Sequence, residues 1–271
     1  MTYRLSLVSR ASVWKLIPVV SVSLACAAWA GSVRAEYKKG ADKKTDKLDP
    51  KAVEICKKAG ELYKQAKTFH SDGTIDAKID AGGQQLDINA TLAFDFERPN
   101  QVAIKVRVKS DPDEGLDFIS DGKKLTIFRR KIEQYVQEDA PKNVGGLGLA
   151  VLKLGVRSPG ILLPNVLHAD PGASLLDGVN SCTYVGTEKV DGTPAHHLKF
   201  SQEQFDWEMW VASEGKPFIL RMTRTAEIPG GKLNTVETYK NWTIDAPSGK
   251  DAFAFSPPKG TTKVDEFTDA N

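Results

Sequence analysis

Few side chains in this 271-residue chain are spaced for catalysis or metal binding. His196 and His197 are adjacent, and neighbouring side chains on a strand point to opposite faces, so the pair cannot chelate one ion. The serines lack the context of a nucleophile elbow. Gly145-Gly146-Leu147-Gly148 opens an apolar segment and lacks the lysine of a phosphate-binding loop. We therefore predict a protein that is not an enzyme and that uses no metal and no cofactor.

The composition indicates a folded chain with a substantial core. Hydrophobic residues make up 41% of the chain and charged residues 27%, and the formal net charge is +2. This charge is too balanced for a nucleic-acid footprint, and the chain has no basic helix or aromatic–basic platform. We therefore expect no nucleic-acid partner.

The N-terminus is unlike the rest of the chain. Arg4, Arg10 and Lys15 precede an apolar run at residues 16–30, and small residues lead up to Ala35. This pattern predicts a signal peptide at residues 1–35, cleaved near Ala35, and hence export to the periplasm. The alternative is an uncleaved N-terminal anchor. Residues 36–50 are charged and lack periodicity, which predicts a flexible linker before a domain at residues 51–271.

Two cysteines remain after the predicted cleavage, Cys56 and Cys182. An oxidising compartment permits a disulfide between them, but two cysteines form no recognisable framework. A disulfide and two buried free thiols both stay open at this point.

The central stretch, residues 91–136, has the period-two pattern of strands with one apolar face. An odd loop around Pro99-Asn100 pairs Phe96 with Val102 and Phe94 with Ile104, which keeps the apolar sets together. A two-residue loop at Asp121-Gly122 would place Phe118 opposite Leu125 and Leu116 opposite Ile127. We expect a four-strand antiparallel meander, with Arg98 at its rim.

Helices are expected before and after this meander. Asp49 and Pro50 are a predicted N-cap and first helical residue, followed by about four amphipathic turns. Residues 141–157 are apolar on nearly all sides yet rich in glycine, and a second short apolar helix follows at residues 161–168. These two segments are either a movable lid or a plain connection that covers the core.

Strand patterns return after residue 174. Asp191-Gly192 predicts a tight turn, and Trp207, Met209 and Val211 share one face of a strand. In the next strand the alternation places Phe218, Leu220 and Met222 on one face and Ile219 with Arg221 on the other. Strands in succession, with helices clustered at two places, predict an α+β fold with an antiparallel sheet.

The chain carries, in this order, Phe69-His70, an Arg98-Pro99-Asn100 (RPN) motif, Ser120-Asp121-Gly122-Lys123 and Tyr135. These motifs resemble those of LolA, the periplasmic carrier of outer-membrane lipoproteins. Later residues, including Tyr184-Val185-Gly186, Trp207-Glu208-Met209-Trp210 and Phe253-Ala254-Phe255, are similar to a bacterial family of predicted periplasmic proteins of unknown function in the same superfamily. The resemblance covers about residues 51–262.

The resemblance implies an unclosed antiparallel β-barrel, or half-barrel, of about ten strands covered by an N-terminal helix and lid helices. It also implies that acyl chains are held between the sheet and the lid. Arg98 matches the arginine of the RPN motif, which in LolA contacts the lid and is needed for cargo transfer; here it is the predicted lid and transfer switch. The long charged linker and the lid composition depart from LolA, which leaves the cargo open.

We predict a monomeric periplasmic carrier or binding protein for a lipid or a lipidated protein, with a membrane-bound donor or acceptor as a further partner. The predicted cavity residues are Phe94, Phe96, Ile104, Val106, Phe118, Leu125 and Ile127 of the sheet, and Leu147, Val151, Leu154, Leu162 and Leu163 of the lid. The alternative is a periplasmic sensor or regulatory module that binds a partner protein with the same half-barrel. A third hypothesis is an enzyme with an unrecognised site.

Overall fold

The computed structural model describes residues 47–147, 165–203, 205–228 and 230–267. Most of these residues belong to one twelve-stranded sheet. The strands are β1 (Thr68–Ala81), β2 (Gln84–Glu97), β3 (Gln101–Val108), β4 (Asp111–Asp121), β5 (Lys124–Arg129), β6 (Gln134–Asp139), β7 (Val179–Val190), β8 (Thr193–Gln202), β9 (Phe205–Ala212), β10 (Ile219–Ile228), β11 (Gly231–Ile244) and β12 (Thr262–Lys263). The helices are α2 (Pro50–Gln65) and α5 (Pro171–Ser174). None of the helices described is both long enough and apolar enough to cross a membrane.

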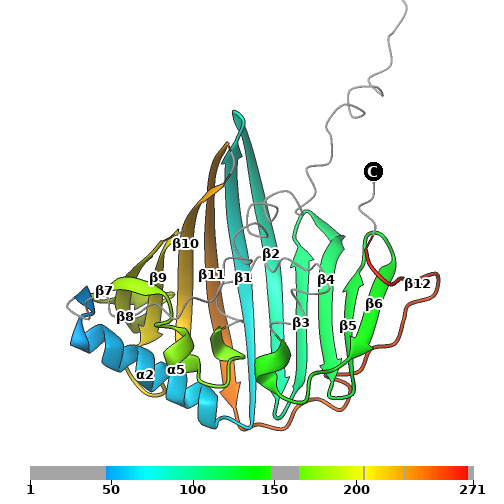
Figure 1. Ribbon diagram of the computed structural model, residues 1–271, viewed down its shortest axis with the longest axis horizontal. Helices are drawn as coiled ribbons and strands as arrows, with labels where there is room; N and C mark the ends of the chain where they lie inside the picture. Colours follow the sequence, from blue (N-terminus) through cyan, green and yellow to red (C-terminus); the bar gives the residue numbers. More distant parts are fainter. Residues whose placement is uncertain (1–46, 148–164, 204, 229, 268–271) are drawn as a thin grey trace, which may run out of the picture.

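Two antiparallel meanders share this sheet. The strand order is β12-β6-β5-β4-β3-β2-β1-β11-β10-β9-β8-β7, so the first strand of one meander pairs with the last strand of the other. Figure 1 shows β7 and β12 at opposite ends of the curved sheet. The predicted α+β fold with an unclosed antiparallel half-barrel is therefore confirmed. Twelve strands are described where about ten were expected; β12 has two residues and pairs in parallel with β6, which no period-two pattern signals.

The helix α2 begins as its sequence predicts. The Asp49 side chain accepts a hydrogen bond from the Lys51 N–H. Pro50 occupies the first turn, where backbone N–H groups have no acceptor within the helix, so its lack of an N–H costs no hydrogen bond. The buried face of α2 joins the same core as the concave side of the sheet. Both helices run along the lower end of the β7–β11 half (Figure 1). At this contact Gly60 lies against Gly172 of α5, and a Cβ on Gly60 would be 2.3 Å from the Gly172 Cα.

The hairpin registers test the sequence predictions directly. Phe94 pairs with Ile104 and Phe96 with Val102 across a three-residue loop, as predicted. The Asp191-Gly192 turn is also confirmed, because Val190 pairs with Thr193 and both loop residues have positive φ.

The predicted pairing of β4 with β5 is wrong by two residues. Phe118 lies opposite Ile127, and Leu116 lies opposite Arg129. The reason is that the tight loop begins one residue later: Gly122 has a φ of 90°, and the Asp121 carboxylate accepts hydrogen bonds from the backbone N–H groups of Lys123 and Lys124. A shift of two residues keeps every side chain on its predicted face.

The predicted faces of β10 are also wrong at one end. A register shift between Ile219 and Arg221 places Ile219 opposite Val211 and Met222 opposite Met209. Ile219 and Met222 are both fully buried in the concave core, although the period-two pattern had put them on opposite faces. An extra residue in one strand reverses the alternation on either side of it.

The C-terminal segment wraps around the β6 edge of the sheet. On the convex side Phe253 packs in a small cluster with Ala103 and Ile119, and the ring of Phe255 is 5.3 Å from that of Tyr135. β12 then pairs with β6, and Val264 donates its backbone N–H to the Tyr135 carbonyl. Val264 and Phe267 pack on the concave core. The segment therefore contacts both faces of the sheet at this edge.

Candidate functional site

The concave face of the sheet carries a continuous apolar surface, which we call the concave floor. Period-two alternation and the observed registers bring its side chains to one face. In the β1–β6 half it consists of Ile75, Leu92, Phe94, Phe96, Val102, Ile104, Val106, Leu116, Phe118, Leu125, Ile127 and Val136. The seven predicted sheet residues therefore share this face.

The predicted cavity residues differ in how far protein covers them. Five of the seven sheet residues are buried, whereas Ile104 and Val106 of β3 keep part of their surface exposed. Leu147, in a helical turn at residues 144–147, is fully buried in the same core. Val151, Leu154, Leu162 and Leu163 lie outside the described residues. Whether any of these residues touches a ligand stays a prediction.

Aromatic rings fill the end of the floor nearest the RPN loop. The Phe69 ring lies 5.1 Å from Phe94 and 4.6 Å from Phe96, and Tyr63 of α2 packs on Phe69 and Trp242. Tyr63 is fully buried, and its hydroxyl accepts a hydrogen bond from the Ile219 N–H at 3.0 Å. Burial raises the pKa of Tyr63 well above that of a free tyrosine. This end of the floor is closed by protein.

Arg98 of the RPN loop holds the C-terminal end of α2. Its Nε donates to the Ala66 carbonyl at 2.9 Å and its Nη2 donates to the Tyr63 carbonyl at 3.0 Å. These are carbonyls that a helix leaves without partners at its C-terminus, and a cation there also suits the helix dipole. Arg98 therefore lies at the rim of the sheet, as expected. Its predicted contact with the lid stays a prediction, because residues 148–164 of the lid segments lie outside the described residues.

Asn100 connects the two motifs that the sequence singled out. Its side-chain amide donates to the Gly122 carbonyl at 3.0 Å and to the Pro141 carbonyl at 2.5 Å, and its own carbonyl accepts from Ser120 Oγ at 2.7 Å. Asn100 and Ser120 are both buried. The RPN loop, the β4–β5 turn and the start of the apolar segment at 141–147 are thus held at one point.

A polar pair in the middle of the floor escaped sequence reasoning. Glu237 and Tyr239 of β11 face the concave side, since Glu237 pairs with Ile75 and with Met222. Glu237 is completely buried, and the Tyr239 hydroxyl donates a hydrogen bond to its carboxylate. Burial, followed by the neighbouring carboxylate, raises the pKa of Tyr239. Local pattern gives no signal for this pair, because Leu233, Thr235, Glu237 and Tyr239 mix apolar and polar side chains on one face and Val236 lies on the other.

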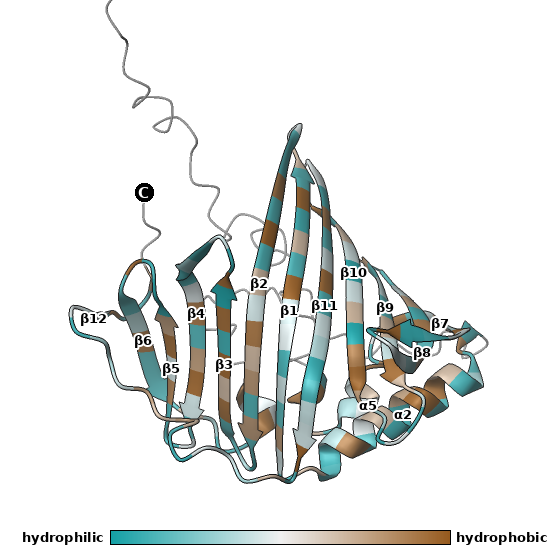
Figure 2. Cartoon of the chain, turned by 180° about the vertical axis from the view of Figure 1, so that it is seen from behind, coloured by the Kyte–Doolittle hydropathy of each residue, from teal (hydrophilic) through white to brown (hydrophobic). Residues whose placement is uncertain are grey.

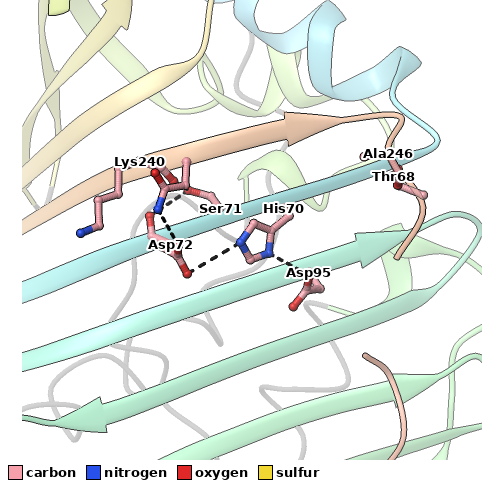
Figure 3. Close-up of polar contacts among 8 residues, drawn as sticks. Thr68, His70, Ser71, Asp72, Asp95, Lys240 and Ala246 are labelled. Atoms are coloured by element: carbon pink, nitrogen blue, oxygen red, sulfur yellow. Dashed lines mark hydrogen bonds and ion pairs between the residues drawn. The ribbon is translucent and has the colours of Figure 1, made fainter. Parts of the chain in front are cut away.

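The convex face carries a histidine–aspartate cluster near the closed end (Figure 3). His70 Nδ1 is 2.8 Å from Asp95 Oδ1, and Asp72 lies on the other side of the ring, with Oδ1 3.7 Å from Nε2. Ser71 is next to His70 in sequence but faces the concave side, and its hydroxyl donates to the Lys240 carbonyl. The serine and histidine therefore do not form a catalytic pair.

The two adjacent histidines are separated by the sheet, as predicted. His196 lies near Tyr184 on the side of α2, whereas His197 stacks on Trp210 and contacts the carboxylates of Glu188 and Glu208. Among the residues described, no three His, Cys, Asp or Glu side chains are grouped to hold a metal ion. Cys56 and Cys182 are buried free thiols.

Two hollows occur at the closed end rather than on the floor. One has a volume of about 400 Å³ and is bordered by Lys67, Glu97, Arg98 and Asp245. The other, of about 130 Å³, lies beside His70 and Asp95. None of the seven predicted cavity residues of the sheet borders either hollow.

A single open sheet with an apolar concave face, partly covered by helices, places the protein in the class of unclosed β-barrels. Within that class the chain belongs to the family described as "Predicted periplasmic protein (DUF2092)", which matches residues 52–266. The predicted relationship to a family of periplasmic proteins, and the predicted periplasmic location, are confirmed.

Solved structures of similar fold cover most of the chain. Mycobacterium tuberculosis lipoprotein LppX is 16% identical over 74% of this chain and 98% of its own, with a TM-score of 0.42. A LolA superfamily protein from Nitrosomonas europaea is 13% identical over 74% and 96%, with a TM-score of 0.34. MucB, in the Pseudomonas aeruginosa MucA/MucB complex, is 14% identical over 76% and 61%, with a TM-score of 0.35. No curated protein matches the chain in sequence.

Proposed function

We propose that this periplasmic protein binds and carries acyl chains of a lipid or a lipidated protein on its concave floor, without catalysis. The observation that carries the proposal is the partial exposure of Ile104, Val106 and Leu116 within an apolar face whose other named residues are buried. Apolar surface that the described chain leaves uncovered gains about 25 cal/mol per Å² when a ligand removes it from water. An acyl chain supplies that cover without requiring a polar partner.

The cover already present on the floor indicates where a ligand would lie. Phe94 and Phe96 are already covered by Phe69, so a ligand would lie over β3, β4 and β5 rather than at the aromatic end. Ile104, Val106 and Leu116 form the partly covered row there. Release would then require only that water regain this surface. A membrane-bound donor or acceptor, acting on a monomeric carrier, belongs to the same proposal.

Displacement of a fluorescent long-chain fatty acid tests the proposal. Val106→Asp should weaken probe binding by at least about tenfold, because the bound chain would have to desolvate a carboxylate. Leu220→Asp is the matched control, since Leu220 is also partly buried but packs with Trp210 on the convex side. Native mass spectrometry of the protein purified from its own periplasm should show bound acyl species. A wild-type protein that neither binds the probe nor carries such species would refute the carrier function.

A further inference from the structure

The concave floor has two unlike ends. At the RPN end, Tyr63, Phe69, Phe96 and Trp242 pack together and Arg98 fixes the end of α2 over them. At the other end, the β1–β2 and β10–β11 hairpins project beyond the neighbouring strands (Figures 1 and 2). Among the described parts of the chain, the aromatic cluster blocks the RPN end, so a long apolar molecule that reaches the floor along the strands would come from the hairpin end.

Apolar alternation continues along the projecting hairpins to their tips. On β2 the floor-facing side chains change from buried Phe94, Leu92 and Ala90 to partly exposed Ile88 and to Leu86, which is 41% exposed. The residues between them, Asp87, Asn89 and Thr91, are polar, and hydrophobic and hydrophilic bands alternate along β2 in Figure 2. A hairpin that served only as a solvent-exposed connection would not need this alternation beyond the point where the core ends.

Two hairpins share this apolar surface. Ile79 of β1 pairs with Leu86 on one side and with Leu233 of β11 on the other, so the three side chains form one row on the concave face. The tips are joined by a hydrogen bond from the Gly82 N–H to the Gly230 carbonyl at 3.1 Å. We call Ile79, Leu86, Ile88 and Leu233 the tip patch. It is continuous with the floor and is held as one unit.

We propose that the tip patch is the port through which an acyl chain reaches the concave floor. The inference rests on the proposed acyl binding and adds the direction of loading and the residues that the chain meets first. Beyond the tip patch, Ala90 and Leu92 of β2 are buried, but they pair with Val108 and Val106 of β3, which are partly exposed. An acyl chain that passes from the tip patch to Val108 and Val106 would therefore stay in contact with apolar surface. The same path in reverse would release the cargo at the tips.

The exposed leucine and an exposed valine give a matched test. Leu86 and Val185 are the large hydrophobic residues that are clearly exposed in the described chain, at 41% and 49%. Val185 lies on the edge strand β7 at a register irregularity. Leu86→Glu should slow the association of a fluorescent long-chain fatty acid about tenfold, because contact with roughly two methylene groups is lost at the port. Val185→Glu should leave the association rate unchanged. Both proteins should unfold at the wild-type temperature, since neither side chain is buried.

The outcomes separate this inference from the proposed function. A wild-type protein that binds no probe refutes both. A wild-type protein that binds the probe, with Leu86→Glu associating as fast as Val185→Glu, overturns the port and leaves the carrier intact. A second measurement needs no variant: a photoreactive fatty acid mixed briefly with wild-type protein should label peptides of residues 79–88 before peptides of β3–β5. Early labelling near residues 63–69 or on β7 would also overturn the port.

Discussion

The side-chain amide of Asn100 donates a hydrogen bond to the carbonyl of Pro141 at 2.5 Å. The same amide donates to Gly122, so the first residues of the apolar segment after the meander are anchored to the RPN loop. We predict that Asn100→Asp, which keeps the shape but replaces a donor by an acceptor, lowers the free energy of unfolding by about 1–3 kcal/mol. Urea unfolding followed by fluorescence measures this. Asn89→Asp, at an exposed position, is the control and should change stability little.

Arg98→Leu removes both hydrogen bonds to the C-terminal carbonyls of α2. We expect a loss of about 1–3 kcal/mol, because the Tyr63 and Ala66 carbonyls lose charged donors. Hydrogen exchange should show faster opening of the last turn of α2 in this variant. Arg98→Lys should recover only part of the stability, since an ammonium lacks the guanidinium fork. Wild-type protection of α2 in Arg98→Leu would show that the contact does not hold the helix.

The close approach of Gly60 to Gly172 predicts that Gly60→Ala is destabilising. Alanine is the better helix former, yet its Cβ would lie 2.3 Å from backbone atoms of α5, which cannot move like the end of a side chain. A loss of about 1–3 kcal/mol is expected in thermal or urea unfolding. Gly249→Ala is the control, because a Cβ there meets no atom within 4 Å. A more stable Gly60→Ala protein would contradict the packing of α2 on α5.

Tyr239→Phe should destabilise the protein although it retains the ring. The phenol donates to the buried Glu237 carboxylate, and its removal takes one donor from a group that is shielded from water. We expect a loss of about 1–3 kcal/mol in urea unfolding. In the Glu237→Gln background the same change should cost less, because a neutral amide needs the donor less than a carboxylate does. Equal losses in both backgrounds would argue against the pair.

Buried tyrosines predict a loss of stability at alkaline pH. Burial raises the pKa of both Tyr63 and Tyr239 above the usual value of about 10, so the unfolded chain releases these protons at a lower pH than the folded chain. Their contribution is fully present below about pH 10 and is lost as the pH rises further. The free energy of unfolding should therefore fall between about pH 9 and about pH 11. The free energy of unfolding of Tyr63→Phe should fall less steeply with pH than that of the wild-type protein.

Sequence reasoning succeeded where one property repeats along a strand. The alternation around Phe94 and Ile104 fixed both the face and the register of β2 and β3, because any odd slip would have exposed the apolar set. The same rule tolerated an error of two residues at Phe118, since such a slip changes neighbours but not faces. It failed at Ile219, where an irregularity in β10 reversed the alternation.

Contacts between distant segments were beyond the reach of local patterns. Nothing in the residues around Arg98 indicates that its guanidinium meets the carbonyls of α2. The contact between Asn100 and Pro141 could not be predicted either, because both are loop residues and three separate turns lie between them in the chain. The burial of Glu237 depends on strands from both meanders, so it follows only from the complete sheet.

The pairing of β1 with β11 determines when this protein can complete its fold. Ser71 and Lys240, joined at this seam, are 169 residues apart in the chain. Each meander consists of neighbouring hairpins that can form early, but the seam must close a very long loop before its contacts stabilise anything. Until residues 231–244 are available, one side of β1 exposes unpaired backbone groups that invite pairing with another chain. A chain that emerges from its N-terminus first is therefore most prone to aggregation in the interval before β11 emerges.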